Sequence, residues 1–332
     1  MLHPVDNRQL AANLSVGWSL LGVIFLVAFF CVGCNRTLLN NTTERPAVSE
    51  WIRSQSEAQG ARAKRIASQA AATLRNIPLP QGPSPSHQRH WRPDLSVLPF
   101  AEIQSDRVSL YNIRDCEYRT EEDYDVRHFD RQIMLDDVRT VDFIVVPFKE
   151  TPAIAHTMLS FGLTDGQQIV FSVEARLEQG EDYAALAGAS RQYELMWVVG
   201  TERDLIRLRT DVRNVDVYLY PINASPEQVR KVFLASLARV NEVARTPEFY
   251  DLVTNNCTTN IVDLVNSLRP GSIRPDLRVV LPGHSDRLAY DLGLLAVEGP
   301  FETVKIASRI NAQAVIHSDS PDFSKAIRYW RR

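Results

Sequence analysis

Two strand-like runs on either side of an Asp-Gly turn constrain the fold of this chain most strongly. Residues 155–161 and 169–176 alternate polar and apolar side chains, and Asp165-Gly166 lies between them. A turn of this kind between two alternating runs is a strong signal for a β-hairpin. Because successive side chains of a strand point to opposite faces, the register of the hairpin decides which residues share a face.

The alternation selects one register. If the turn centres on residues 164–166, the numbers of opposed residues sum to about 330. His156 then lies opposite Glu174, Met158 opposite Ser172, and Ser160 opposite Val170. One face carries His156, Ser160, Ser172 and Glu174, and the other carries Leu159, Phe161, Ile169, Phe171 and Val173. A shift by one residue would mix the faces, whereas a shift by two would pair His156 with Ser172. We expect the apolar set to face the core and the polar set to line a site.

A cysteine stands where a second element is predicted to begin. Cys257 follows the polar residues Thr254 to Asn256, and a helical pattern begins at Cys257. A thiol in the first turn of a helix is close to free amide protons, which stabilise its thiolate. The same amides can hold an oxyanion after the sulfur attacks a carbonyl. The alternative interpretation is a half-buried structural cysteine beside a helix cap.

His156 and Glu174 supply the groups that a cysteine nucleophile needs. The imidazole can take and return a proton, and a carboxylate opposite it can orient the ring. A His–Glu pair alone is more often a surface cross-strand pair, but together with Cys257 it predicts a Cys257–His156–Glu174 triad. The remaining predicted site residues give oxyanion or general support, and they are Asn255, Asn256, Thr258 and Ser172.

Three further features bear on this triad. His284 is a rival base, because it follows Cys257 as in papain-like enzymes, but it lies in a Pro-Gly turn and a solvated loop is favoured.

Cys116 precedes an acidic stretch predicted to be an exposed loop, and an oxidising compartment would permit a Cys116–Cys257 disulfide that abolishes activity. The charged run Glu202-Arg203-Asp204 is predicted to form surface ion pairs, with one member buried near the site as an alternative.

Composition argues against several classes of function. The formal net charge is −3, so no basic surface for nucleic acid is indicated. The sequence contains no CxxC pair with histidines at zinc spacing and no Gly-rich phosphate loop. We therefore expect no metal, no other cofactor and no nucleic-acid partner.

The N-terminal part indicates a connection to a membrane. After a tail over residues 1–15, residues 16–34 are apolar and uncharged, which is close to the length that crosses a bilayer as a helix. We favour a single uncleaved anchor in the inner membrane with the rest of the chain in the periplasm. The alternatives are a lipoprotein signal with Cys34 as the lipidated residue, and a cleaved signal peptide.

The remaining chain divides into a tether, a domain and an extension. Residues 35–90 are predicted to be a helical stalk and a Pro-rich linker. Residues 91–300 are predicted to form the domain, and residues 301–332 a C-terminal extension. Within the domain we expect strands over residues 108–113, 141–147, 193–199 and 215–220 and an amphipathic helix over 226–244, capped by Ser225 and with Val229, Val232, Phe233, Leu237 and Val240 at helical spacing. Strands and helices occur in blocks, which indicates an α+β fold.

Several segments together resemble the Lnb N-terminal periplasmic domain family. They are AHTMLSF, FSVEARLEQGEDY, YELMWVVGTERDLIRLRT, VYLYPI, RVNEVARTPEFYDLVTNNCTTNI and LPGHSDRLAYDLGLL, in order between about residues 91 and 295. The resemblance implies a circularly permuted papain-like (NlpC/P60-type) thiol fold in which the histidine precedes the cysteine. It also implies Cys257 as nucleophile, His156 as general base and Glu174 as the orienting acid.

The resemblance further implies an acyl-transfer function. The family is similar to bacterial lipoprotein N-acyltransferases and, more distantly, to a lysosomal transacylase with a Cys-His-Glu triad. We expect an extracytoplasmic cysteine acyltransferase or acyl hydrolase that takes its acyl group from a phospholipid or lipoprotein at the membrane. Lnb-type acyltransferases carry further transmembrane helices, which are not found before Arg332. The alternatives are a cysteine peptidase or amidase on cell-wall peptides, and a non-catalytic interaction module.

Overall fold

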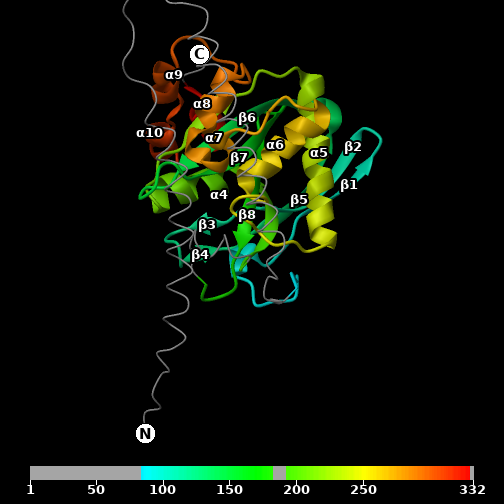
Figure 1. Ribbon diagram of the computed structural model, residues 1–332. Helices are drawn as coiled ribbons and strands as arrows, with labels where there is room; N and C mark the ends of the chain where they lie inside the picture. Colours follow the sequence, from blue (N-terminus) through cyan, green and yellow to red (C-terminus); the bar gives the residue numbers. More distant parts are fainter. Residues whose placement is uncertain (1–83, 182–191, 330–332) are drawn as a thin grey trace, which may run out of the picture. The chain divides into compact units, whose positions relative to one another are not determined.

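A computed structural model describes residues 84–181 and 192–329 (Figure 1). The predicted tail, membrane segment and nearly all of the stalk lie outside the described residues. Among the residues described, no helix is both long enough and apolar enough to cross a bilayer. The described residues combine one large sheet with several helices, as the α+β prediction requires.

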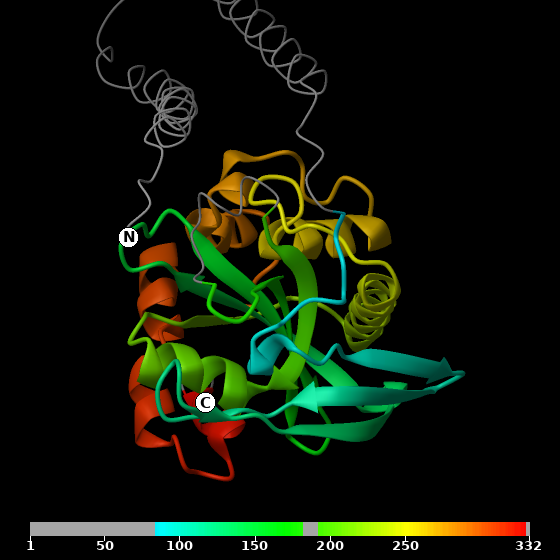
Figure 2. The same cartoon turned by 90° about the horizontal axis from the view of Figure 1, so that it is seen from below.

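The centre of the fold is an eight-stranded sheet in the order β1-β2-β9-β8-β7-β6-β10, with β5 paired to β2. Neighbouring strands are antiparallel except β2 and β9, which run parallel. Teal β1, β2 and β5 extend to one side of the molecule in Figure 2. The strands are β1 (Phe100–Gln104), β2 (Arg107–Arg114), β5 (His128–Met134), β6 (Val138–Pro147), β7 (Ala155–Leu163), β8 (Gln168–Arg176), β9 (Glu194–Thr201) and β10 (Tyr218–Pro221), and a separate two-stranded sheet holds β3 (Glu117–Tyr118) and β4 (Tyr124–Asp125).

The helices follow the strands for the most part. The longest are α5 (Pro226–Arg245) and α6 (Cys257–Leu268). The shorter ones are η1 (Pro93–Leu95), η2 (Leu135–Asp137), α4 (Glu202–Arg207), the π-helical turn η3 (Leu208–Val212), α7 (Leu277–Val280), η4 (Pro282–His284), α8 (Ser285–Asp291), α9 (Phe301–Ser308), α10 (Asn311–Ile316) and α11 (Phe323–Ala326).

The predicted hairpin and its register are confirmed. In the pairing of β7 with β8, Met158 lies opposite Ser172 and Ser160 opposite Val170. These partner numbers add up to the same value, so the one-residue shift is excluded. The pairing ends at Met158 and Ser172, and beyond it the side chains of His156 and Glu174 lie 3.3 Å apart.

The apolar face of this hairpin packs under helix α5. The rings of Phe161 and Phe171 lie 5.2 and 5.6 Å from that of Phe233 in edge-on contacts. Ser225 caps the helix, as predicted, and forms a capping box with Gln228. The positions predicted to face the core are buried, apart from Val232, which is only partly covered.

The polar face of the hairpin is covered as well, which corrects a prediction. We expected all of the polar set to line a site, but Ser160 and Ser172 have no exposed surface. The Ser160 hydroxyl donates a hydrogen bond of 2.5 Å to Glu202 at the start of α4. Since Ser160 and Phe161 point to opposite faces, α4 covers the face opposite α5. Only the His156–Glu174 end of the polar set reaches a cavity.

The predicted surface pairing of the run Glu202-Arg203-Asp204 is wrong for its two acids. Glu202 is 1% exposed and Asp204 is fully buried. Asp204 receives two hydrogen bonds of 2.8 and 2.9 Å from Arg114 of β2. Both acids stand in the first turn of α4, which faces the sheet, and each meets an arginine there.

The partner of Glu202 comes from the C-terminal end of the described chain. Arg328 donates to both oxygens of Glu202, and also to Asp142 at 2.8 and 2.9 Å. The red C-terminal helices accordingly lie beside the green helix α4 (Figure 2). Phe323 and Ile327 are buried next to this arginine, so the predicted extension packs on the polar face of the sheet.

Replacing this arginine is expected to destabilise the protein strongly. Arg328→Ala leaves the buried acids Glu202 and Asp142 without a shared guanidinium, and the loss of one partner of a buried ion pair typically costs roughly 3–5 kcal/mol. The matched control is Arg309→Ala, which removes an exposed pair with Asp216 and costs at most about 1 kcal/mol. Urea denaturation of the two variants measures the difference, and equal midpoints would contradict the assignment.

Candidate active site

A cavity of about 520 Å³ opens where β7 begins and β8 ends. Its lining includes His156, Glu174 and Cys257, which stand far apart in the sequence. Its volume is within the range of roughly 300–1,000 Å³ that is usual for small-molecule sites. The structure thus brings the three residues of the predicted triad to one cavity.

Cys257 is the first residue of helix α6, as predicted. The cap is Asn256, whose side-chain oxygen accepts hydrogen bonds from the amides of Thr258 and Thr259. Cys257 is only 3% exposed, and the exposed part faces the cavity. This cap fixes the position of the sulfur because it sets the direction in which α6 starts.

The predicted supporting residues take up structural hydrogen bonds. Asn255 donates through its side-chain amide to Glu248 at 2.9 Å, and Asn256 donates to the carbonyl of Leu252 at 2.6 Å. The Thr258 hydroxyl lies 3.0 Å from that of Thr157 on β7. The side chains of Asn255 and Asn256 therefore shape the turn before Cys257. Since the amides of Thr258 and Thr259 donate to the Asn256 side chain and that of Asn260 to the Asn256 carbonyl, an oxyanion at this site would depend on the backbone amide of Cys257.

His156 is held on one side by a serine and a carboxylate. Its Nε2 lies 2.7 Å from the Ser172 hydroxyl and 3.3 Å from Glu174. The Ser172 hydroxyl in turn donates to Glu174 at 2.6 Å. A proton on Nε2 can satisfy this chain of bonds, which leaves Nδ1 for the reaction. Ser172 lies directly opposite Met158, and its hydroxyl reaches His156 diagonally across the hairpin. The contact between His156 and Ser172 therefore does not require the two-residue shift.

Opposite charges set the protonation of the site. Burial raises the pKa of the Cys257 thiol, but the neighbouring His156 imidazolium outweighs burial and lowers this pKa to about 7. Burial lowers the pKa of His156, but Glu174 and the thiolate outweigh it and raise that pKa to about 9. The pKa of Glu174 lies well below its usual value, because His156 and Arg209 outweigh its burial. A thiolate–imidazolium pair is the result near neutral pH.

Arg209 belongs to the site, and the sequence analysis did not identify it. Its guanidinium donates to Glu174 at 3.0 Å and to the carbonyl of Leu205 at 2.7 Å. It lies in the π-helical turn η3 and is almost fully buried. The segment holds three arginines, Arg203, Arg207 and Arg209, and their spacing does not indicate which one turns inward. The inserted turn of η3 decides this, and such turns are frequent at functional sites.

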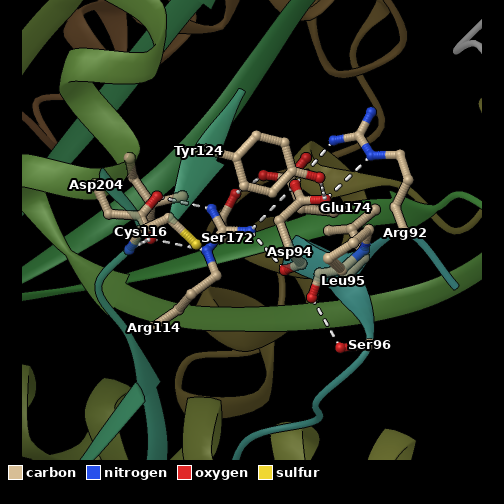
Figure 3. A network of polar contacts seen from close by, with 12 residues as sticks. Arg92, Asp94, Leu95, Ser96, Arg114, Cys116, Tyr124, Ser172, Glu174 and Asp204 are labelled. Atoms are coloured by element: carbon tan, nitrogen blue, oxygen red, sulfur yellow. Dashed lines mark hydrogen bonds and ion pairs between the residues drawn. The ribbon is translucent and has the colours of Figure 1, made fainter. Parts of the chain in front are cut away.

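The second cysteine of the described chain has a different environment. Cys116 is buried, and burial with the nearby Asp204 raises its pKa to about 12. Figure 3 shows it within the network of Arg114, Asp204 and Asp94, where its backbone amide donates to Asp204. Both thiols are free. The acidic stretch after Cys116, predicted to be a loop, forms the small β3–β4 hairpin.

The rival base, His284, lies outside the cavity. It is exposed on η4, whereas Pro282 of the same turn lines the cavity. Gly283 lies against the loop before β7, with its amide donating to the carbonyl of Ala153 at 2.9 Å. A β-carbon on Gly283 would lie 1.8 Å from the carbonyl oxygen of Pro152, so only glycine permits this approach.

Across residues 84–181 and 192–329, no group of three or more His, Cys, Asp or Glu side chains could hold a metal ion.

Comparison with known proteins gives one match. The sequence model of a family described as the Lnb N-terminal periplasmic domain matches residues 124–283, a range that contains His156, Glu174, Arg209 and Cys257. No curated protein and no solved structure matches the chain.

The pH dependence of alkylation tests the charge state of Cys257. Because its pKa is lowered to about 7, the thiolate forms as the pH rises through neutrality, and the rate of reaction with iodoacetamide should level off above about pH 8. His156→Ala removes the stabilising charge and should move the midpoint above the ordinary value for cysteine. Peptide mass spectrometry follows Cys257 and, as internal control, Cys116, which should react only in strong alkali. A midpoint unchanged in His156→Ala would contradict the ion pair.

Opposite shifts in the pKa of His156 test the roles of Glu174 and Arg209. Glu174→Gln removes the carboxylate that raises this pKa, whereas Arg209→Gln removes the guanidinium that partly neutralises the carboxylate. We expect the pKa of His156 to fall in the first variant and rise in the second, each by about 1. Imidazole NMR in a Cys257→Ser background, which excludes the thiolate, measures both shifts. Shifts of the same sign would mean that the variants act only by loosening the structure.

Proposed function

Residues 124–283 belong to the Lnb N-terminal periplasmic domain family, and from this premise we propose that the protein is a cysteine acyltransferase or acyl hydrolase acting on lipid acyl esters. The observation that carries the proposal is the meeting of Cys257, His156 and Glu174 at one cavity, where Nε2 of His156 lies 3.3 Å from Glu174 and the imidazolium lowers the pKa of the thiol. A low-pKa thiol in a cavity, next to an oriented histidine, is the arrangement of a nucleophile with its general base.

In the first half of the proposed reaction the enzyme is acylated. The Cys257 thiolate attacks the ester carbonyl, and the backbone amide of Cys257 at the start of α6 stabilises the oxyanion. The carbon–oxygen bond then breaks, and the leaving alcohol takes the proton from Nδ1 of the His156 imidazolium. The acyl group stays on Cys257 as a thioester, and His156 is left neutral.

In the second half the acyl group leaves the enzyme. An acceptor alcohol, amine or water molecule gives its proton to neutral His156 as it attacks the thioester. The carbon–sulfur bond breaks, and the thiolate–imidazolium pair forms again. Glu174 and Ser172 hold Nε2 throughout, so that Nδ1 stays directed at the reacting atoms.

The order of the elements supports a fold of the permuted papain-like type. The strand that carries His156 precedes the helix that carries Cys257, whereas papain-like enzymes usually have the cysteine first. The family is periplasmic by its description, which fits the periplasmic location expected from the sequence. An anchor at residues 16–34 would keep the cavity near its lipid substrate at a high effective concentration.

Acylation of Cys257 is the direct test. The full chain is incubated in vesicles of phosphatidylethanolamine and phosphatidylglycerol, and the peptide containing Cys257 is examined by mass spectrometry. We expect a hydroxylamine-sensitive acyl group on Cys257 in the wild type and none in Cys257→Ser. The rate should fall by roughly 10²–10⁴ in His156→Ala, which lacks the general acid and base. It should be greatest between about pH 7 and 9, where the ion pair exists.

His284→Ala is the matched control for this experiment, because it removes a histidine of the neighbouring turn η4 that does not line the cavity. An unchanged rate is expected. Absence of any acyl group from either lipid would refute the acyl-enzyme mechanism, and a loss of rate in His284→Ala equal to that in His156→Ala would refute the assignment of the base.

A further inference from the structure

A second cavity lies on the other side of helix α6. It has a volume of about 550 Å³, and apolar side chains dominate its lining. Its floor is formed by Val141 and Phe143 of β6 and Leu159 of β7, and one wall by Val262 and Val265 of α6. Leu159 shares a face with Phe161, so this groove opens on the α5 side of the sheet. We refer to it as the α6 groove.

Helix α6 connects the groove with the active site. Its first residue, Cys257, lines the catalytic cavity, and the next, Thr258, lines the α6 groove. The Thr258 hydroxyl lies 3.9 Å from the sulfur of Cys257. The segment after α6 has the same double role, because Val280 lines the catalytic cavity and Val279 the groove. The two spaces therefore share two wall segments, the start of α6 and residues 279–280.

The two cavities differ in their charged groups. Arginines and acidic residues both line the catalytic cavity, including Arg92, Arg213 and Glu150. The lining of the α6 groove contains no acidic residue, and its ionisable groups are two exposed cations, Lys231 and Arg269. Lys231 is paired with Glu227 at 2.7 Å on the exposed face of α5, so an anion there would compete with Glu227 for Lys231. An apolar floor with cations at its rim complements a molecule that has an apolar chain and an anionic group.

Apolar side chains also reach the surface at the mouth of the groove. Leu268 at the end of α6 and Leu292 after α8 both line it, and they are 40% and 42% exposed. An apolar surface that continues from solvent into a deep groove marks a binding site more often than a packing defect. The groove is therefore accessible from outside the protein.

We propose that the α6 groove binds a fatty acyl chain of an anionic membrane phospholipid, with the anionic group near Lys231 and Arg269. As a subsite of the lipid substrate, this assignment rests on the function proposed above. The groove then holds one acyl chain of the lipid beside the helix that carries Cys257. Binding of the chain itself does not require the thiol.

Photo-crosslinking in membranes tests the assignment. The full chain is produced in membranes supplied with phosphatidylglycerol that carries a diazirine in its acyl chain, and crosslinked peptides are mapped by mass spectrometry. We expect crosslinks in segments 141–143, 258–268 and 288–294 and at Leu159, which line the groove, and fewer in residues 146–156, which line the catalytic cavity. Val262→Glu places an unpaired carboxylate in the groove and should reduce these crosslinks on the order of tenfold. Ile306→Glu is the matched control, because it changes an apolar residue that is 78% exposed and does not line the groove.

Two further variants separate the lipid, the charge and the reaction. The double variant Lys231→Glu with Arg269→Glu should weaken crosslinking by phosphatidylglycerol more than by phosphatidylcholine with the same chain. Cys257→Ala should keep the groove crosslinks, because chain binding does not need the thiol. If the wild type shows these crosslinks but forms no acyl enzyme, only the proposed function is refuted. Thermal unfolding of each variant identifies those that fail to fold.

Three results would overturn the assignment. One is crosslinking confined to residues 16–34, which would reflect lipid around a membrane segment. Another is groove labelling that Val262→Glu leaves unchanged. The third is contact of the groove with residues 1–83 or with a second copy of the chain in place of lipid, as detected by crosslinked peptide pairs.

Discussion

The polar face of the central sheet depends on buried pairs of a carboxylate and a guanidinium. Helix α4 and the turn η3 press against this face and contribute one member of each pair: Glu202 meets Arg328, Asp204 meets Arg114, and Arg209 meets Glu174. An uncompensated charge in this position would be very costly, so each group requires its partner at hydrogen-bonding distance. Antiparallel sheets often leave one face in water, but here these pairs allow both faces to be covered.

The candidate active site uses the same kind of pair in a modified form. Glu174 is shared between Arg209, Ser172 and His156, and it lies at the edge of the covered region, where the cavity begins. A carboxylate held by a fixed arginine cannot turn away from the imidazole. The bonds from Arg209 and Ser172 keep Glu174 beside His156 in the absence of substrate, and Glu174 is the charge that contributes most to raising the pKa of His156.

Helix α6 contributes to the walls of both cavities. Its first turn presents Cys257 to a cavity with charged walls, and its next residues form the wall of an apolar groove. A lipid has both kinds of surface in one molecule. The proposed acyl chemistry and the proposed binding of an acyl chain thus rely on different residues of a single helix.

The sequence by itself was enough to predict the β7–β8 hairpin, the helices α5 and α6, and the three residues His156, Glu174 and Cys257 that meet at one cavity. The alternation in residues 155–176 sufficed for the register of the hairpin, because only one register separates polar from apolar side chains, and the helical spacing after Ser225 and Asn256 sufficed for α5 and α6. The tertiary structure alone decided that α4 covers the polar face, that Glu202 and Asp204 are buried, that Arg209 is the arginine that turns inward, and that a groove lies behind Cys257. These features depend on contacts between residues more than 30 positions apart, such as Glu202 with Arg328, and a local pattern carries no information on which distant charge will compensate a buried one.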